Sequence, residues 1–334
     1  METRNPEGPV VPRIAAVVPV FRERRHVGAV LARFGPEVQR IYVVDDACPD
    51  ATGRMVEETC TDPRVRVLFH GENRGVGGAT MTGYAAALAD GADVVVKVDG
   101  DGQMDPALIP QLVTPILRGE ADYVKGNRFH NLEGLGSMPT ARLFGNAVLS
   151  FVTKISTGYW NVFDPNNGFT AIHTAVLREL PLARISSGYF FESDMLFRLN
   201  TLQAVVVDVP MRAVYRTEES KLRVSHALVD FSVRHAKNTM RRIVYNYYLR
   251  NFNVASLQIL FGLLFVLFGG TFGAFAWWRS LRTGAAATTG TVMLAALPIL
   301  VGVQLLLAFA SYDMASLPTR PIHARLAGPL APPE

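Results

Sequence analysis

The 334-residue sequence has few cysteines and little charge. Its two cysteines, Cys48 and Cys60, are too few for a disulfide framework, and no metal-ligand spacing surrounds them. Charged residues make up 19% of the chain, against about 25% in an average soluble protein. The hydrophobic share of 49% excludes a disordered chain, because disordered chains have too few apolar residues to bury. We therefore expect a folded protein of a reducing compartment.

Two long stretches near the C-terminus contain no charged residue. They are the 28 residues between Arg250 and Arg279 and the 30 residues between Arg282 and Asp313. About 20 apolar residues cross the hydrocarbon of a bilayer, so each stretch is long enough to span a membrane. The alternative is a pair of helices buried in a soluble core, which we disfavour because core helices are shorter.

Positive charge is concentrated just before the first of these stretches. Between Arg212 and Arg250 there are nine Lys and Arg residues and three Asp and Glu residues. The two stretches predict a multi-pass membrane protein, and the positive-inside rule places the preceding domain in the cytoplasm. We expect the membrane to be a bacterial-type cytoplasmic (inner) membrane. The N-terminal METRNPEGPVVPR lacks the apolar core of a signal peptide, so we expect none.

The first two thirds of the chain have the pattern of an α/β domain, in which apolar runs alternate with helical spacing. The expected strands are residues 13–20, 39–45, 65–70, 94–99, 123–126, 168–173 and 204–209. The expected helices are residues 24–34, 51–60, 79–88, 106–118, about 141–156 and 192–203.

This pattern divides the chain into four parts. They are a soluble domain (1–224), a basic amphipathic juxtamembrane segment (225–250), a two-span hairpin (251–313) and a cytoplasmic tail (314–334). The spans are expected at about 254–278 and 285–311, joined by a short turn of sequence RSLRTG.

The most informative motif is Asp99-Gly100-Asp101, followed by Gln103, at the end of an apolar run. Two carboxylates one residue apart at a strand end can converge on one hard divalent cation, either Mg²⁺ or Mn²⁺. Such a cation completes its coordination shell with substrate phosphates. For the motif taken alone, a solvated acidic turn is the alternative.

Three other strand ends are also polar. Pro19–Glu23 follow the first strand, Asp45 and Asp46 end the second, and the glycine-rich Asn73–Ala79 follow the third and open a helix. Ligands of open α/β sheets bind at the carboxyl ends of strands, and glycines at a helix N-terminus allow an anionic ligand to approach. Each segment alone could be a turn or a cap, but four on one rim favour a binding site.

The ordered segments VVPVFRE, VVDDACPDAT, NRGVGGATMTGY and VKVDGDGQMDP resemble family 2 glycosyltransferases of the GT-A fold. The resemblance is strongest to polyprenyl-phosphate hexose synthases, including dolichyl-phosphate mannose synthase and undecaprenyl-phosphate glucosyltransferases. It implies a Rossmann-like, mostly parallel α/β sheet that binds a nucleotide sugar. Amphipathic juxtamembrane helices and a two-helix transmembrane hairpin would follow this catalytic domain.

The resemblance also implies roles for individual residues. The base and ribose positions are matched by Pro19, Phe21, Glu23 and Asp46. The diphosphate site is matched by Gln103 and by the metal ligands Asp99 and Asp101. The remaining diphosphate-contacting positions are matched by Arg216, Ser220 and Lys221, in a segment one residue shorter than the family's R-x-x-G-x-S-K. The expected catalytic residues are Asp101, Arg128, Asp164, Glu192 and Asp194.

The activity that the resemblance implies is inverting, metal-dependent transfer of a hexose from a nucleotide diphosphate sugar to polyprenyl phosphate, for cell-envelope glycan or glycoconjugate assembly. A lipid phosphate has a second pKa of about 6 and is already an anionic nucleophile, so Asp164 would position substrate. A saccharide hydroxyl would instead need Asp164 or Asp194 as general base. The basic residues of 225–250 would attract the acceptor, and relatives can assemble as homo-oligomers.

Two alternatives belong to other classes. A processive polysaccharide synthase would carry Q-x-x-R-W, but no arginine precedes any of the three tryptophans. A non-catalytic membrane protein could bind a nucleotide sugar without turnover, although the intact pair Asp99 and Asp101 argues against it. Nucleic acid is not an expected partner, because the basic and aromatic segment adjoins a membrane span.

Overall fold

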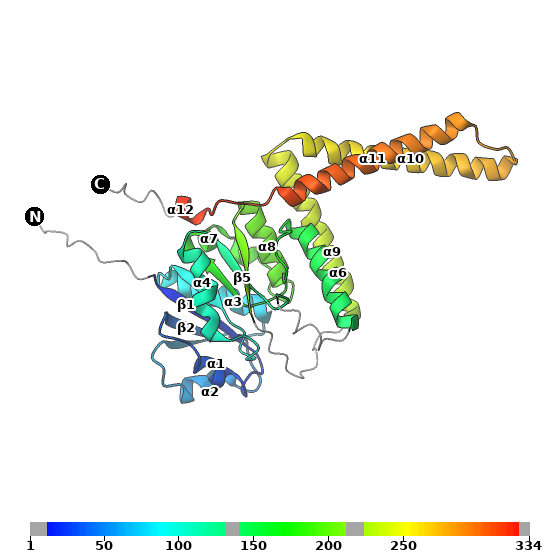
Figure 1. Ribbon diagram of the computed structural model, residues 1–334. Coiled ribbons are helices and arrows are strands. Elements are labelled where there is room, and N and C mark those ends of the chain that lie inside the picture. The colour runs from blue at the N-terminus through cyan, green and yellow to red at the C-terminus, as the bar shows by residue number, and fades with distance from the viewer. Residues whose placement is uncertain (1–11, 131–139, 212–223, 327–334) are drawn as a thin grey trace, which may run out of the picture. The chain divides into compact units, whose positions relative to one another are not determined.

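The computed structural model describes residues 12–130, 140–211 and 224–326 (Figure 1). The chain forms two compact units. One comprises Met1–Asn238 together with Pro318–Glu334, and we call it the sheet unit. The other comprises Thr239–Leu317, and we call it the hairpin unit.

The sheet unit is built on seven strands in the order β3-β2-β1-β4-β6-β5-β7. Their bounds are β1 Ile14–Val20, β2 Val38–Asp45, β3 Val65–Phe69, β4 Val94–Lys97, β5 Tyr123–Asn127, β6 Thr170–His173 and β7 Val206–Pro210. β6 is antiparallel to β4 and β5, and the other pairs are parallel. The predicted mostly parallel α/β sheet is confirmed.

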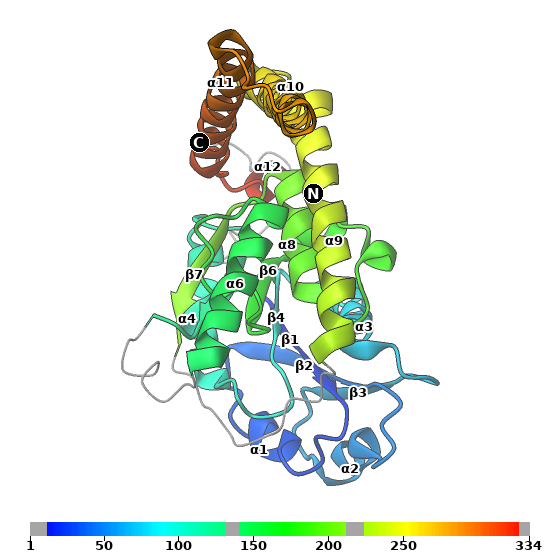
Figure 2. The same ribbon diagram turned by 90° about the vertical axis from the view of Figure 1, so that its right-hand side faces the viewer.

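Helices cover both faces of this sheet (Figures 1 and 2). They are α1 Val27–Leu31, α2 Thr52–Thr59, α3 Gly75–Ala89, α4 Ile109–Leu117, α6 Thr140–Thr157, α7 Thr174–Glu179 and α8 Phe191–Leu202. α3 begins earlier than predicted, because the carboxylate of Asp46 accepts hydrogen bonds from the amides of Arg74 and Gly75. The six-residue α7 was not predicted, since so short a helix shows no clear periodicity.

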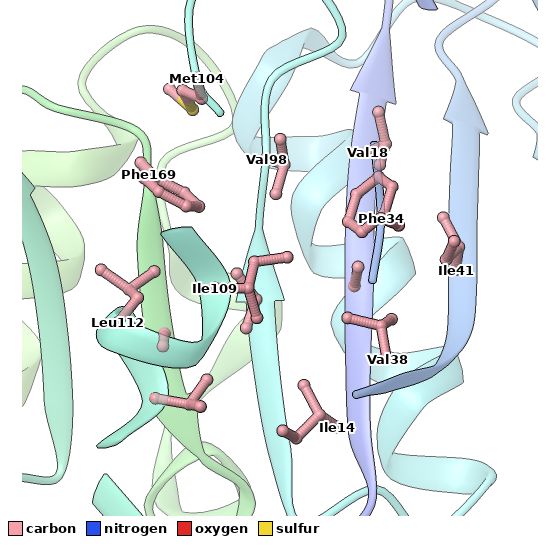
Figure 3. Close-up of a cluster of buried hydrophobic side chains, with 14 of the residues drawn as sticks. Ile14, Val18, Phe34, Val38, Ile41, Val98, Met104, Ile109, Leu112 and Phe169 are labelled. Atoms are coloured by element: carbon pink, nitrogen blue, oxygen red, sulfur yellow. The ribbon is translucent and has the colours of Figure 1, made fainter. Parts of the chain in front are cut away.

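The main hydrophobic core lies between one face of the sheet and helices that include α1 and α4. Ile14 and Val18 of β1 belong to it, together with Ile109 of α4, which lies in front of β4 (Figure 3). Successive strand residues point to opposite faces, so Val17 points away from this core and towards α3. A Cβ at Gly83 of α3 would lie 2.2 Å from Val17, which explains the glycine.

In the hairpin unit, α10 (Val254–Thr283) and α11 (Thr289–Ala315) run antiparallel (Figure 1). They pack so closely that a Cβ at Gly302 would lie 2.8 Å from the carbonyl oxygen of Gly262. Both are long and apolar enough to cross a membrane, and 17% and 11% of their most apolar windows are buried. Core helices of a soluble protein are mostly buried, so this exposure disfavours that alternative.

The turn of the hairpin lies later than predicted. RSLRTG was expected to form it, but α10 continues through residues 279–283 and the connection to α11 comprises residues 284–288. Gly284 ends α10 with a φ of +67°, the left-handed conformation that favours glycine at a helix C-terminus. The two arginines of the segment, Arg279 and Arg282, are therefore helical.

A buried polar cluster ties the ends of the hairpin unit together. α9 (Val224–Val244) continues into a π-helical turn, Tyr245–Arg250, which agrees with the helical juxtamembrane segment predicted over 225–250. Arg242 donates to both carboxylate oxygens of Asp313 in α11, over 2.6 and 3.0 Å, and the Tyr247 hydroxyl donates to Asp313 over 2.6 Å. The side chains of Arg242 and Asp313 are each 4% exposed.

The predicted tail contains a segment that belongs to the sheet unit. The amides of Ile322 and His323 each donate to Asp122 over 2.9 Å, next to the short helix α12 (His323–Leu326). The His323 ring stacks on His173 with 4.4 Å between centroids. Buried Asp122 therefore anchors a segment that is 200 residues away in sequence.

Candidate active site

A cavity of about 440 Å³ lies at the carboxyl ends of β1, β2 and β4, bounded also by the N-terminus of α3 and the segment before α8. Six residues to which the sequence analysis assigned a role line it: Pro19, Phe21, Glu23, Asp46, Asp99 and Asp101. Asn73 and Gly75 of the glycine-rich segment line it too. The four polar strand ends therefore surround one cavity, as expected for a sheet with this topology.

Asp46 links β2 to the start of α3. Its carboxylate accepts hydrogen bonds from the amides of Arg74 and Gly75 over 2.8 and 2.7 Å. His70 Nδ1 lies 2.7 Å from Asp46 Oδ1, and its other ring nitrogen lies 2.8 Å from the hydroxyl of Thr82. His70 was missed by the sequence analysis, although it is the last residue of the predicted strand 65–70.

The glycines of α3 have a role within the fold besides the predicted one of admitting a ligand. On one side of the glycine-rich segment, the chain itself packs where a side chain would otherwise lie. A Cβ at Gly75 would lie 2.6 Å from the carbonyl oxygen of Ser187, and one at Gly77 would lie 2.3 Å from that of Ser186. Gly75 also has a φ of +79°. These glycines therefore allow the segment before α8 to pack on the first turn of α3.

Asp99 and Asp101 place two carboxylates at the cavity wall. Burial, and then the negative charge of Asp99, raise the pKa of Asp101 to about 6. Negative charge on both carboxylates is therefore unfavourable without a counter-ion, and a bound cation would supply one. The backbone amide of Gln103 donates to Asp101 over 2.9 Å, so Gln103 orients that carboxylate through its main chain. Among the described residues, no group of three or more His, Cys, Asp or Glu side chains could hold a metal ion. The pair thus fits a cation that takes further ligands from a substrate.

Lys97 of β4 lies behind this pair and is the main residue that the sequence analysis missed. Its fully buried amine donates to Asp99 over 2.6 Å and to Glu192 over 3.5 Å. Burial lowers the pKa of Lys97, but the charges of Asp99 and Glu192 outweigh it and raise that pKa above its ordinary value. A lysine inside the apolar run VVVKVD, two residues before an aspartate, was the available signal.

Arg128 and Asp164 form a bidentate ion pair. Arg128 Nε donates to one carboxylate oxygen over 2.7 Å and Nη2 to the other over 3.0 Å. Asp164 is 2% exposed at its side chain, and neither residue is in the described lining of the cavity. Both oxygens of Asp164 are thus engaged by Arg128, which the sequence analysis also expected to be catalytic.

The acidic pair of α8 is divided between two tasks. Glu192 approaches Lys97, whereas Asp194 accepts hydrogen bonds from the amide of Ser186 over 2.9 Å and from Arg198 over 3.2 Å. The described lining of the cavity includes neither carboxylate. Three further candidates, Arg216, Ser220 and Lys221, lie outside the described residues.

Comparisons with known proteins show which proteins this chain is similar to. The sequence model of glycosyl transferase family 2 matches residues 16–181. Undecaprenyl-phosphate mannosyltransferase of Micrococcus luteus is 34% identical over 225 residues, covering 66% of this chain and 91% of the relative. UDP-N-acetylglucosamine–dolichyl-phosphate N-acetylglucosaminyltransferase of Methanococcus voltae is 29% identical over 234 residues, covering 66% and 92%.

A solved structure has the same fold. Glucosyl-3-phosphoglycerate synthase from Mycobacterium tuberculosis, in complex with Mn²⁺, UDP-glucose and phosphoglyceric acid, superposes with a TM-score of 0.51 at 20% identity. The match covers 69% of this chain and 79% of that one. The fold and the 34% identity over 91% of a relative agree with the motif order read from the sequence. The chain belongs to glycosyl transferase family 2.

Proposed function

We propose that the protein transfers a hexose from a nucleotide diphosphate sugar to polyprenyl phosphate in a membrane, with inversion at the anomeric carbon. The observation that carries this proposal is the presence, in one chain, of the cavity lined by Asp99 and Asp101 and of two long apolar helices that are largely exposed. The two relatives named above have different sugars in their names but share a lipid phosphate acceptor.

In this proposal the nucleoside lies against Pro19, Phe21, Glu23 and Asp46, and the diphosphate lies at Asp99 and Asp101. When bound, Mg²⁺ or Mn²⁺ supplies positive charge opposite the diphosphate, where negative charge increases as the sugar departs. Gln103 holds Asp101 through its amide. Mn²⁺ in the structural neighbour is consistent with this choice of cation.

Arg128 is the proposed cationic donor to the phosphates, and Asp164 fixes its orientation. Because both oxygens of Asp164 already accept from Arg128, this carboxylate is poorly placed to act as a general base. A phosphate acceptor needs no such base, since it is anionic near neutral pH. This ion pair therefore favours a lipid phosphate over a saccharide hydroxyl as nucleophile.

The membrane part of the proposal concerns α10 and α11. The Micrococcus luteus relative is matched over 91% of its length by 66% of this chain, so most of the remaining third has no counterpart in it. We propose that α10 and α11 anchor the enzyme in the cytoplasmic membrane and that basic residues of 225–250 attract the anionic acceptor. The positive-inside rule supports a cytoplasmic catalytic domain.

The test is transfer to a lipid. Purified full-length protein is incubated with polyprenyl phosphate, Mg²⁺ or Mn²⁺ and a panel of labelled UDP- and GDP-sugars. We expect labelled lipid extractable into organic solvent, lost in Asp101→Asn and after chelation of the cation. Labelling of a saccharide hydroxyl, with no labelled lipid from any donor, would refute the proposal.

A further inference from the structure

The segment that precedes α8 contributes to the cavity, although it lies beyond residues 16–181 that match the family. Gly188 and Tyr189 of this segment line the cavity. Tyr189 is 60% exposed, although it is a large aromatic residue. A side chain of this kind at a cavity wall has an apolar face and a polar hydroxyl available to a ligand.

The backbone of this segment is held against α3. The amide of Gly78 donates to the carbonyl oxygen of Ser187 over 3.1 Å. The glycines at positions 75 and 77 leave room for the carbonyl groups of residues 186 and 187, as described above. The start of α3 therefore fixes the backbone of Ser186 and Ser187, which lead into Tyr189.

Asp194 holds the same segment from the side of α8. Its carboxylate accepts the amide hydrogen bond of Ser186 and is itself held by Arg198, which also donates to the carbonyl oxygen of Arg184. The side chain of Asp194 is 9% exposed. Because this carboxylate is engaged with the chain rather than with the cavity, its effect on a ligand must pass through the segment.

Tyr189 lies at the end of the cavity where Asp46 holds α3. A Cβ at Gly75 would lie 3.3 Å from the Cα of Gly188, and the amide of Gly75 donates to Asp46. The lining includes a second aromatic side chain, Phe21, at the end of β1. Aromatic rings bind nucleobases by stacking on their faces.

We propose that Tyr189 is a donor-binding residue whose ring contacts the nucleoside of the nucleotide sugar, and that Asp194 is the positioning residue that keeps it there. This inference rests on the proposed function only for the class of donor. It gives Asp194 a role in donor affinity, in place of the catalytic role expected from the sequence.

The test measures nucleotide binding without any acceptor. UDP and GDP are titrated into the full-length protein with Mn²⁺, for the wild type and for Tyr189→Ala, Tyr189→Phe and Asp194→Asn. We expect Tyr189→Ala to weaken binding about tenfold, within the range found when a stacking aromatic is removed, and Tyr189→Phe to bind nearly as wild type. Phe151→Ala, an equally exposed aromatic outside the cavity lining, is the matched control.

A double-mutant cycle tests the role of Asp194. If Asp194 acts through Tyr189, Asp194→Asn weakens binding in the wild type and adds little in the Tyr189→Ala background. Full additivity, or wild-type affinity in Tyr189→Ala, would overturn the inference. A protein that binds UDP or GDP through Tyr189 but labels no lipid would contradict the proposed acceptor and leave this inference standing.

Discussion

Two buried ion pairs, one in each unit, have opposite surroundings. In the sheet unit Lys97 is fully buried, but its partner Asp99 is 26% exposed at the cavity wall. In the hairpin unit Arg242 and Asp313 are each 4% exposed, and Asp313 accepts from both Arg242 and Tyr247. Asp99 therefore keeps lone pairs for a ligand, whereas the protein itself uses those of Asp313.

The difference teaches what distinguishes a site from a structural element. A buried charge alone does not indicate function, because both pairs contain a buried cation. Asp99 differs in that its carboxylate oxygens face a cavity and still have lone pairs for a ligand. Four predictions follow, beginning with the largest expected effect, and the first three separate these two roles.

Lys97→Met is expected to affect both stability and activity. It leaves Asp99 and Glu192 without their shared cation, and breaking a buried pair in this way costs about 3–5 kcal/mol of unfolding free energy. Transfer should fall about 10- to 100-fold, as for residues that orient metal ligands. Denaturant unfolding and the dependence of rate on Mn²⁺ concentration measure the two effects. An unchanged Mn²⁺ dependence would show that Lys97 does not orient Asp99.

Asp313→Ala is expected to destabilise the hairpin unit and to spare the donor site. Arg242 loses its buried partner, at a cost of about 3 kcal/mol. Thermal unfolding in detergent should shift downward, while UDP or GDP affinity stays at the wild-type value. Weaker nucleotide binding by this variant would contradict the structural role assigned to Asp313.

Asp99→Asn is expected to have the opposite effect, a loss of activity with little loss of stability. Loss of the carboxylate at the cavity should reduce transfer about 100-fold, equivalent to about 2.7 kcal/mol of transition-state stabilisation. The unfolding temperature should change little, because Lys97 retains Glu192 and the carbonyl oxygen of Gly168 as partners. Glu58→Gln, on the exposed face of α2, is the control for removing a carboxylate. A large loss of stability in Asp99→Asn would show that Asp99, like Asp313, serves the stability of the fold.

Acid should destabilise the sheet unit through a buried histidine, His235. Burial lowers the pKa of His235 to about 4. Its folded pKa is below the unfolded value of about 6.5, so the unfolded state takes up the proton first. Stability is therefore fully present above pH 6.5 and is lost as the pH falls towards 4, by less than about 1.4 kcal/mol per pH unit. Unfolding midpoints of wild type and His235→Gln across this range measure the contribution, and parallel curves would exclude His235.

Sequence reasoning located the strand ends well and their partners poorly. Asp46, Asp99 and Asp101 could be found because each ends or follows an apolar run. The hydrogen bond between Asp194 and Ser186 gave no sequence signal, since a carboxylate in a helix is equally compatible with solvent or substrate. The anchoring of Ile322 by Asp122 was also unpredictable, because the chain distance of 200 residues leaves no local pattern.

By itself the sequence determined the alternation of apolar runs and helices, the carboxylate motif and the two charge-free stretches. These are local properties, set by side-chain periodicity and by the cost of placing charge in hydrocarbon. Only the tertiary structure decided which charges meet. It joined Lys97 to Asp99 and Glu192, and it packed the segment that carries Tyr189 against the glycines of α3. Such pairings arise when distant strands and helices pack together, and packing depends on the whole chain.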